Sequence, residues 1–434
     1  MNAKRWMLFA LVLMTGSGFA QAQFLTGRFA TSVYAWKQFD TAGSSANQFR
    51  AFQTVQLSYA RSDLSVHTYL QGGAGGTSDI GKVRAINLYA DWSNIGNMLD
   101  LSLGRQAVYA GVANGNIDGL RAAARFLENQ VRVSAFAGAN VNPDFTGIRK
   151  NIHDNTVFGG QVVTTMVQDL RVGLSYLNRR EERDPYWTLR VRDTSTFSPV
   201  LTYINMDSEA EQYGSIDASY GYGSLLTVYG RYDYDFNLSR SFRAEGSARL
   251  SLTDQLALTT DYTYRAPRVA YNSIFSVFTL NSVNEVEGGL EYTFLPTLRA
   301  FGKWAYVKYS DDSNDRWTLG LNSTYGSFSY SGSSGYAGEL QSFSLQGAYP
   351  LLDRLVTPTL GLSYASYRLS SDAPRDNVFA LLLGADLRPV NAFTVGLQGQ
   401  VMTNRVYKND MRLQARIMYW FAERLTAARP EGTP

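Results

Sequence analysis

Apolar and polar side chains alternate with a period of two residues in one segment of this chain after another. The segment LDLSLG at 99–104 has leucine at every second position, and VRVSAFA at 131–137 alternates valine or alanine with other residues. The segments at 285–294 and 393–401 repeat the pattern. Successive side chains of a strand point to opposite faces, so each segment is expected to be a β-strand with one apolar face. No helical period competes, and the predicted fold class is all-β.

Short and long connections alternate between these segments. Short links are expected near 62–63 and 128–129, and longer ones at 140–155, at 178–211 and at Gly111–Asn116. A closed antiparallel barrel in an outer membrane has this asymmetry, with short periplasmic turns and longer outer loops. Counting the segments between turns predicts about 22 strands, within a range of roughly 18 to 24, which is typical of large barrels.

Length and hydropathy favour a barrel over spanning helices. After the N-terminal region the richest apolar run is FALLLGA at 379–385, far short of the roughly 20 residues that a spanning helix needs. Within a bilayer, all backbone polar groups must be satisfied internally, so only helices and closed barrels can cross. We therefore expect a closed antiparallel transmembrane β-barrel without a plug domain, surrounded by outer-membrane lipids and lipopolysaccharide.

The N-terminal residues predict export. Lys4 and Arg5 precede the apolar run WMLFALVLM, and the small-residue site Ala20–Ala22 follows it. This pattern is typical of a secretory signal peptide. The expected organisation is a signal peptide at 1–22, a barrel at 23–421 and a periplasmic extension at 422–434, and the expected location is the bacterial outer membrane.

Composition excludes several function classes. The chain has no cysteine and two histidines, so disulfides, thiol chemistry and covalent haem attachment through C-x-x-C-H are ruled out. A nucleophilic hydrolase would need a base, and the only histidines are His67, which shares a face with Ser65 and Tyr69, and His153. We expect no enzyme, no cofactor and no metal site. The net charge of +3 lacks the clustered basic excess of a nucleic-acid binder.

The last alternating segment carries the most specific motif. Leu413, Ala415, Ile417, Tyr419 and Phe421 occupy alternate positions. This segment resembles the terminal strand of bacterial outer-membrane β-barrel proteins of the porin type, which ends in an aromatic residue with another aromatic two positions earlier. The resemblance implies that Leu413, Ile417, Tyr419 and Phe421 are recognised by the barrel-assembly machinery. The family usually stops at this aromatic, whereas here the chain continues as AERLTAARPEGTP.

Aromatic girdles and lumen charges follow from the same parity. The outer apolar band of a barrel ends in aromatic residues, and candidates at strand ends are Trp92, Phe126, Tyr176, Phe294, Tyr419 and Phe421.

The residues that alternate with the outward apolar side chains form the complementary parity, which should face the lumen. Its basic residues include Arg121, Arg125, Arg132, Arg171, Arg231, Arg243, Arg249, Arg412 and Arg416, and its acidic residues include Asp91, Asp100, Asp233, Glu245, Glu285, Glu287 and Glu291.

Two interpretations of these charges remain open. Arg121, Arg125 and Arg132 would favour anions locally, and Glu285, Glu287 and Glu291 would favour cations. Alternatively, and in our view preferably, the charges pair across neighbouring strands and hydrate the wall, because exposed pairs contribute little individually. The charge-dense segment Asn178–Asp193 has three interpretations. It folds inward as a constriction, it forms an additional hairpin from 187–193 and 200–206, or it covers the outer surface.

The leading functional hypothesis is a porin-like channel for passive diffusion of small hydrophilic solutes through a charged, water-filled lumen. The alternative is a barrel that sheathes a periplasmic protein partner. Such a barrel would resemble those of porin–cytochrome electron conduits. Any haem would then belong to that partner, such as a multihaem cytochrome, since this chain has no cysteine to attach it.

Overall fold

The computed structural model describes residues 23–39, 45–75, 83–149, 151–182, 185–191, 199–204, 211–268, 281–310, 312–335, 338–370, 372–405 and 409–425. The predicted signal peptide and residues 426–434 lie outside these ranges. Among the described residues, no helix is both long enough and apolar enough to cross a membrane. A single 3-10 turn, η1, at His153–Asn155 precedes β8.

The described residues are almost all in strands. The first half comprises β1 (Gln23–Phe39), β2 (Ser45–Arg61), β3 (Leu64–Ala74), β4 (Val83–Ile95), β5 (Leu99–Ala110), β6 (Ala113–Phe126), β7 (Val131–Asn140), β8 (Thr156–Thr164), β9 (Leu170–Arg179), β10 (Tyr186–Val191), β11 (Pro199–Ile204) and β12 (Glu211–Tyr222). The second half comprises β13 (Leu226–Asp235), β14 (Arg240–Ser251), β15 (Leu256–Arg265), β16 (Val283–Leu295), β17 (Leu298–Lys308), β18 (Ser313–Ser323), β19 (Gly326–Gly335), β20 (Gly338–Ala348), β21 (Val356–Arg368), β22 (Asp376–Val390), β23 (Phe393–Thr403) and β24 (Asp410–Leu425).

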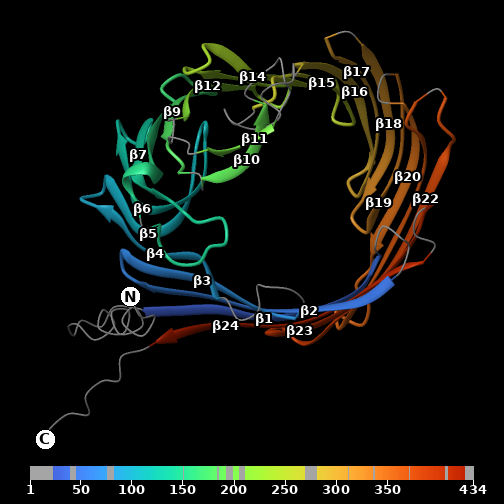
Figure 1. The fold of residues 1–434 in the computed structure, drawn as a ribbon, viewed down its shortest axis with the longest axis horizontal. Helices are drawn as coiled ribbons and strands as arrows, with labels where there is room; N and C mark the ends of the chain where they lie inside the picture. The colour runs from blue at the N-terminus through green and yellow to red at the C-terminus, as the bar shows by residue number, and fades with distance from the viewer. Residues whose placement is uncertain are drawn as a thin grey trace, which may run out of the picture.

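The strands form a closed antiparallel barrel of 22 strands, as predicted. Closure is made by β1 and β24, whose register runs from Gln23 opposite Leu425 to Trp36 opposite Arg412. Figure 1 shows the first strands in blue and the last strands in red side by side at one part of the ring. A sheet closed in this way has no free edge, so each of its 22 strands is paired on both sides.

The additional hairpin in the segment after β9 exists but does not join the barrel. β10 and β11 pair with each other in a separate two-stranded sheet, with Trp187 opposite Tyr203. In Figure 1 this hairpin lies within the outline of the ring. β12 pairs with β9 instead, so the barrel keeps 22 strands and the extra pair does not raise that number.

The two ends of the barrel differ in the length of their connections. At one end, the short-turn end, two residues separate β2 from β3 and two separate β22 from β23. At the opposite, long-loop end, β7 and β8 are joined by the segment at 141–155. The expectation of a longer loop at Gly111–Asn116 is wrong. β5 ends at Ala110 and β6 begins at Ala113, because Gly111 takes φ +60 and permits a tight turn.

The terminal strand continues beyond its predicted end. β24 runs through Phe421 to Leu425 and stays paired with β1 to its last residue. Phe421 lies opposite Gly27, and a Cβ built on that glycine would come within 2.4 Å of the Phe421 ring. The ring also stacks on Phe29, with centroids 6.0 Å apart. Glycine at position 27 therefore makes room for the terminal aromatic on the outer wall.

Candidate functional site

One face of the barrel wall is apolar and exposed. Leu174 is 60% exposed and Leu397 is 62% exposed, although both belong to long, fully paired strands. Similar leucines, isoleucines and valines recur at every second position around the ring. The predicted girdle residues Trp92, Phe126, Tyr176, Phe294 and Tyr419 are also exposed, and all but Tyr419, which lies six residues before the end of β24, are within three residues of a strand end. A continuous exposed apolar surface of this kind is expected where the solvent is lipid.

The other face carries ion pairs between strands and along them. They include Arg125 with Asp100 (3.0 Å), Arg171 with Asp217, Arg231 with Asp233 (2.8 Å), Arg243 with Glu245 (2.6 Å), Arg249 with Glu291, Lys303 with Glu287 (2.7 Å), Arg412 with Asp410 (2.7 Å) and Arg416 with Asp386 (3.5 Å). The predicted acidic group at 285–291 is surrounded by cations rather than left as a negative patch. Arg316 contacts both Glu285 and Glu287, and Arg299 contacts Glu291 at 3.3 Å.

The predicted basic group on β6 and β7 is only partly paired. Arg125 meets Asp100, whereas no ion pair is found for Arg121 or Arg132 within the described ranges. Asp91 accepts a hydrogen bond from the Ser102 hydroxyl at 2.5 Å. The structure therefore brings most of the predicted charges together with partners of opposite sign. Some pairs, such as Arg125 with Asp100, join neighbouring strands as the pairing interpretation expected, whereas others, such as Arg243 with Glu245, lie along one strand. A small basic surplus is left near Arg132.

The hairpin tip between β5 and β6 crosses the inside of the ring. The Val112 backbone amide donates to Ser175 Oγ at 2.9 Å, and Arg231 Nη2 donates to the Gly111 carbonyl at 3.2 Å. Ser175 lies on β9 and Arg231 on β13, and neither strand is a neighbour of β5 or β6. A hairpin can reach both strands only across the interior of a closed wall. The charged face that it touches is therefore the inner face.

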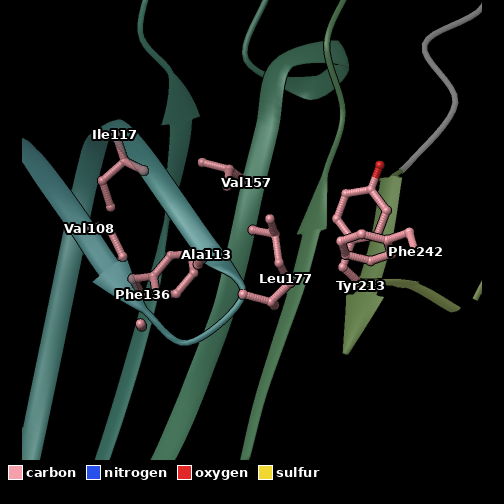
Figure 2. Packing of buried hydrophobic residues seen from close by; sticks show 10 residues of the cluster. Val108, Ala113, Ile117, Phe136, Val157, Leu177, Tyr213 and Phe242 are labelled. Atoms are coloured by element: carbon pink, nitrogen blue, oxygen red, sulfur yellow. The ribbon is translucent and has the colours of Figure 1, made fainter. Parts of the chain in front are cut away.

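An apolar cluster holds this hairpin against the wall. On the hairpin it contains Val108, Ala110, Val112, Ala113 and Ile117; on the wall it contains Phe136 of β7, Val157 of β8, Leu177 of β9, Tyr213 of β12 and Phe242 of β14. Figure 2 shows Val108, Ala113 and Ile117 facing the side chains of the wall strands. Each of these side chains is buried, so the contact between the inserted hairpin and the wall is packed like a protein core.

Arg105 is fixed at the base of the hairpin. Its Nε and Nη2 atoms each donate to a different carboxylate oxygen of Asp118 at 2.7 Å. Its Nη1 atom donates to the Ala85 carbonyl at 3.0 Å and to the Phe145 carbonyl at 2.9 Å, and Nη2 also donates to the Gly147 carbonyl. A planar guanidinium presents donors in a fixed fork that suits this arrangement. Arg105 thus joins β4, β6 and the β7–β8 connection.

Sequence reasoning did not identify Arg105. In a regular strand Arg105 would share the outer face with Leu103, which is 64% exposed. Gly104 lies between them with φ +126, and a Cβ there would stand 2.3 Å from the Leu88 carbonyl oxygen. Such a backbone conformation is essentially restricted to glycine. Arg105 is nevertheless buried, because Asp118 and the carbonyl groups of Ala85, Phe145 and Gly147 surround its guanidinium. In the sequence, the feature that could have identified Arg105 is a charged residue, directly after a glycine, at a position where the alternation predicts an apolar side chain.

The β7–β8 connection is attached to the segment that follows β9. Asn155 is fully buried, donates to the Asn151 carbonyl at 2.8 Å and to Glu182 at 3.2 Å, and accepts from the Glu182 backbone amide at 3.1 Å. Next to it, the hydrogen bond from His153 holds the pKa of the exposed Asp154 carboxyl below its usual range. The hydrogen bonds between Asn155 and Glu182 thereby fix the β7–β8 connection to the segment after β9.

His67, the other histidine, contacts the hydroxyls of Ser58 and Ser65, each at 2.9 Å.

Comparisons with known proteins give only distant likenesses. No family model matches the sequence, and no curated protein matches it. Among solved structures, the P pilus usher (PapC) translocation pore is 9% identical, with a TM-score of 0.44 over 91% of this chain and 99% of that one. Acinetobacter baumannii OccAB4 is 10% identical, with a TM-score of 0.44 over 93% and 99%. Pseudomonas aeruginosa OccK3 (OpdO) is 8% identical, with a TM-score of 0.42 over 92% and 96%.

The class of the protein follows from its own wall. A closed 22-stranded antiparallel ring with an apolar outer face and a charged inner face is an outer-membrane β-barrel. Its interior is that of a channel-like barrel rather than of a solid core, since the inner face carries charged side chains outside the apolar patch on which the inserted hairpin packs.

Proposed function

We propose that this barrel is a passive outer-membrane channel for small hydrophilic solutes, with its short-turn end toward the periplasm. The observation that carries the proposal is the inner face of the ring, where charged and amide side chains are exposed to a space that a ring of this size leaves open to water. Short periplasmic turns and longer outer loops are the usual arrangement in such barrels.

The β5–β6 hairpin would set the size limit of this channel. It packs on β7, β8, β9, β12 and β14 and leaves the opposite part of the wall uncovered. Solutes would therefore pass beside the hairpin, along the strands that it does not touch. Because Ser175 and Arg231 hold its tip by hydrogen bonds, the restriction would be part of the resting structure.

The inner charges would give weak ion selectivity. Opposite charges at 2.6–3.5 Å largely cancel each other's field, and what remains is screened over roughly 8 Å at physiological ionic strength. The surplus that Arg121 and Arg132 leave on β6 and β7 favours anions slightly.

Conductance of the purified barrel in planar bilayers tests the proposal. Wild-type protein should open small, stable channels. A variant in which residues 107–116 are replaced by Asn-Gly, a sequence suited to a two-residue hairpin, keeps Gln106 opposite Ile117 and removes the inserted part. Its conductance should rise while folding is retained. A folded wild-type barrel that never conducts would contradict the proposal.

A sheath for a periplasmic protein is the less well supported alternative. A folded partner needs a free interior, and here the hairpin and the β7–β8 connection already occupy part of it. Co-purification of the wild-type barrel with a haem-containing periplasmic protein, together with closed channels in the bilayer, would favour the alternative.

A further inference from the structure

A hollow in the inner wall lies where the first and last strands meet. It has a volume of about 520 Å³ and is formed by β1, β2, β23 and β24. Besides Ala35 and Leu413, it is lined by the three aromatic residues Tyr34, Trp36 and Phe52, the three amides Gln398, Gln400 and Gln414, and the two arginines Arg50 and Arg412. The hollow is on the part of the ring that the β5–β6 hairpin leaves uncovered.

Strand register explains why these residues meet. Gln398 pairs with Gln414, Gln414 with Tyr34, and Tyr34 with Arg50, which makes one continuous row across four strands. The adjacent row runs from Gln400 through Arg412 to Trp36. Side chains two residues apart on a strand share a face, so both rows project to the inner side, opposite the exposed Leu413. The closed seam is what assembles the hollow.

Two of the three aromatic rings, those of Tyr34 and Phe52, are held by contacts with neighbouring side chains. Tyr34 and Phe52 meet edge to face with centroids 5.9 Å apart, and the Arg50 guanidinium lies 5.8 Å from the Phe52 ring. Gln414 Nε2 donates to the Tyr34 hydroxyl at 3.2 Å. Apolar ring surface in contact with water is unfavourable, and a packed arrangement of rings beside a solute path is a ready contact surface for a ligand with an apolar face.

We propose that this hollow binds a pyranose sugar. The inference rests on the proposed function in that the sugar would be a solute that enters the barrel. A pyranose ring has one face of C–H groups, which packs on an aromatic ring, and a rim of hydroxyls that both donate and accept. Primary amides offer two donors and an acceptor each, so the three glutamines match that rim. Trp36 supplies the ring surface, and the glutamines and the Tyr34 hydroxyl orient the sugar.

The charges in the hollow favour a neutral ligand over an acid. Arg412 is already paired with Asp410 at 2.7 Å, and Arg50 is directed over the Phe52 ring. The remaining polar groups are uncharged amides and a phenol. An aromatic carboxylate would use the rings and Arg50 but would make no hydrogen bonds to the amides of Gln398 and Gln400, which is unfavourable for polar groups that lose water on binding.

Equilibrium titration of the folded barrel in detergent tests the proposal without requiring conduction. Maltose should bind, whereas sorbitol, which has hydroxyls but no ring, and benzoate, which has a ring and a carboxylate, should bind at least about tenfold more weakly. Trp36→Ala should weaken maltose binding about tenfold, equivalent to about 1.4 kcal/mol. Tyr69→Ala, which removes an inner-face ring from β3 opposite Gln56, is the matched control and should bind maltose like the wild type.

Heat-modifiable migration on a gel establishes that each variant is folded. Gln414→Ala provides a second test, at an amide, and should also weaken maltose binding. Benzoate binding in place of maltose, or maltose binding that Trp36→Ala and Gln414→Ala both leave unchanged, would overturn the inference. The outcomes separate the two proposals. A barrel that conducts ions but does not bind maltose keeps the channel and loses the sugar site, whereas one that binds maltose but never conducts keeps the site and loses the channel.

Discussion

Arg105 and Asp118 form a two-pronged ion pair at the root of the inserted hairpin, with both nitrogen–oxygen distances at 2.7 Å. Their side chains are only 6% and 14% exposed. The pair lies between β4 and the β7–β8 connection, to which Arg105 also donates hydrogen bonds. It is thus the point at which the barrel wall, the hairpin and a long-loop-end connection are tied together.

Replacing Arg105 by methionine should loosen the hairpin and destabilise the barrel. Asp118 would remain buried without its cation, and the loss of one partner of a buried pair costs about 3–5 kcal/mol. Guanidinium unfolding of the purified barrel should show this loss, and single-channel recordings should become noisier. The double variant Arg105→Met with Asp118→Leu leaves no unpaired charge and should be more stable than the single variant. Equal stability of the two variants would contradict this account.

Substituting Gly111 by alanine should displace the hairpin tip. An alanine Cβ would come within 2.0 Å of Ser175 Oγ, and the residue has φ +60, a conformation that costs a non-glycine residue about 1–2 kcal/mol. Channel conductance should increase in Gly111→Ala. Gly115→Ala is the matched control on the same hairpin, because nothing lies within 4 Å of the place that its Cβ would take. If both variants conduct alike, the tip does not restrict the channel.

Neutralising Glu287 should shift ion selectivity toward anions. Lys303 and Arg316 both pair with this carboxylate, at 2.7 Å and 3.1 Å, and Glu287→Gln would leave their charges less compensated on the inner wall. Reversal potentials in a salt gradient should move toward the anion value, and the shift should shrink at high salt because of screening. The double variant Glu287→Gln with Lys303→Gln restores the charge balance and should show a smaller shift. An unchanged reversal potential in the single variant would show that these groups do not face the conduction path.

Removing the terminal aromatic ring should impair assembly. Phe421 stacks on Phe29 and Tyr419, with centroids 6.0 Å and 6.1 Å away, and the two ring contacts contribute about 1–3 kcal/mol. Phe421→Ala should lower the fraction of heat-modifiable barrel recovered from the outer membrane. Phe294→Ala removes an exposed ring at the end of β16 and serves as the comparison. A deficit of the same size in both would mean that any girdle aromatic suffices, with no special role for the last strand.

Much of the wall could be predicted from the sequence, because side-chain parity and turn spacing are local properties. The alternation at Leu413–Phe421 predicted the last strand and its outward leucine and isoleucine, and the strand is confirmed as β24. The number of barrel strands was predicted for the same reason. The pairing of Arg243 with Glu245 follows from charges two residues apart on one face.

The interior could not be predicted in the same way. The hairpin tip at Gly111 was mistaken for a longer loop, since glycine and asparagine mark loops as well as turns. What holds the tip inside is contact with Ser175 and Arg231, which are distant in sequence and become neighbours only once the ring has closed. Arg105 was missed because its burial depends on the carbonyl groups of Phe145 and Gly147 in the β7–β8 connection, which are distant in sequence.

The one-sided attachment of the β5–β6 hairpin would place the proposed solute route away from the centre of the barrel. The hairpin packs on strands in one arc of the ring, and the seam between β1 and β24 lies outside that arc. Under the proposed channel function, solutes would pass along the arc that contains β1 and β24, the first and last strands of the barrel. The seam that closes the barrel would then also form part of the wall along the proposed solute path.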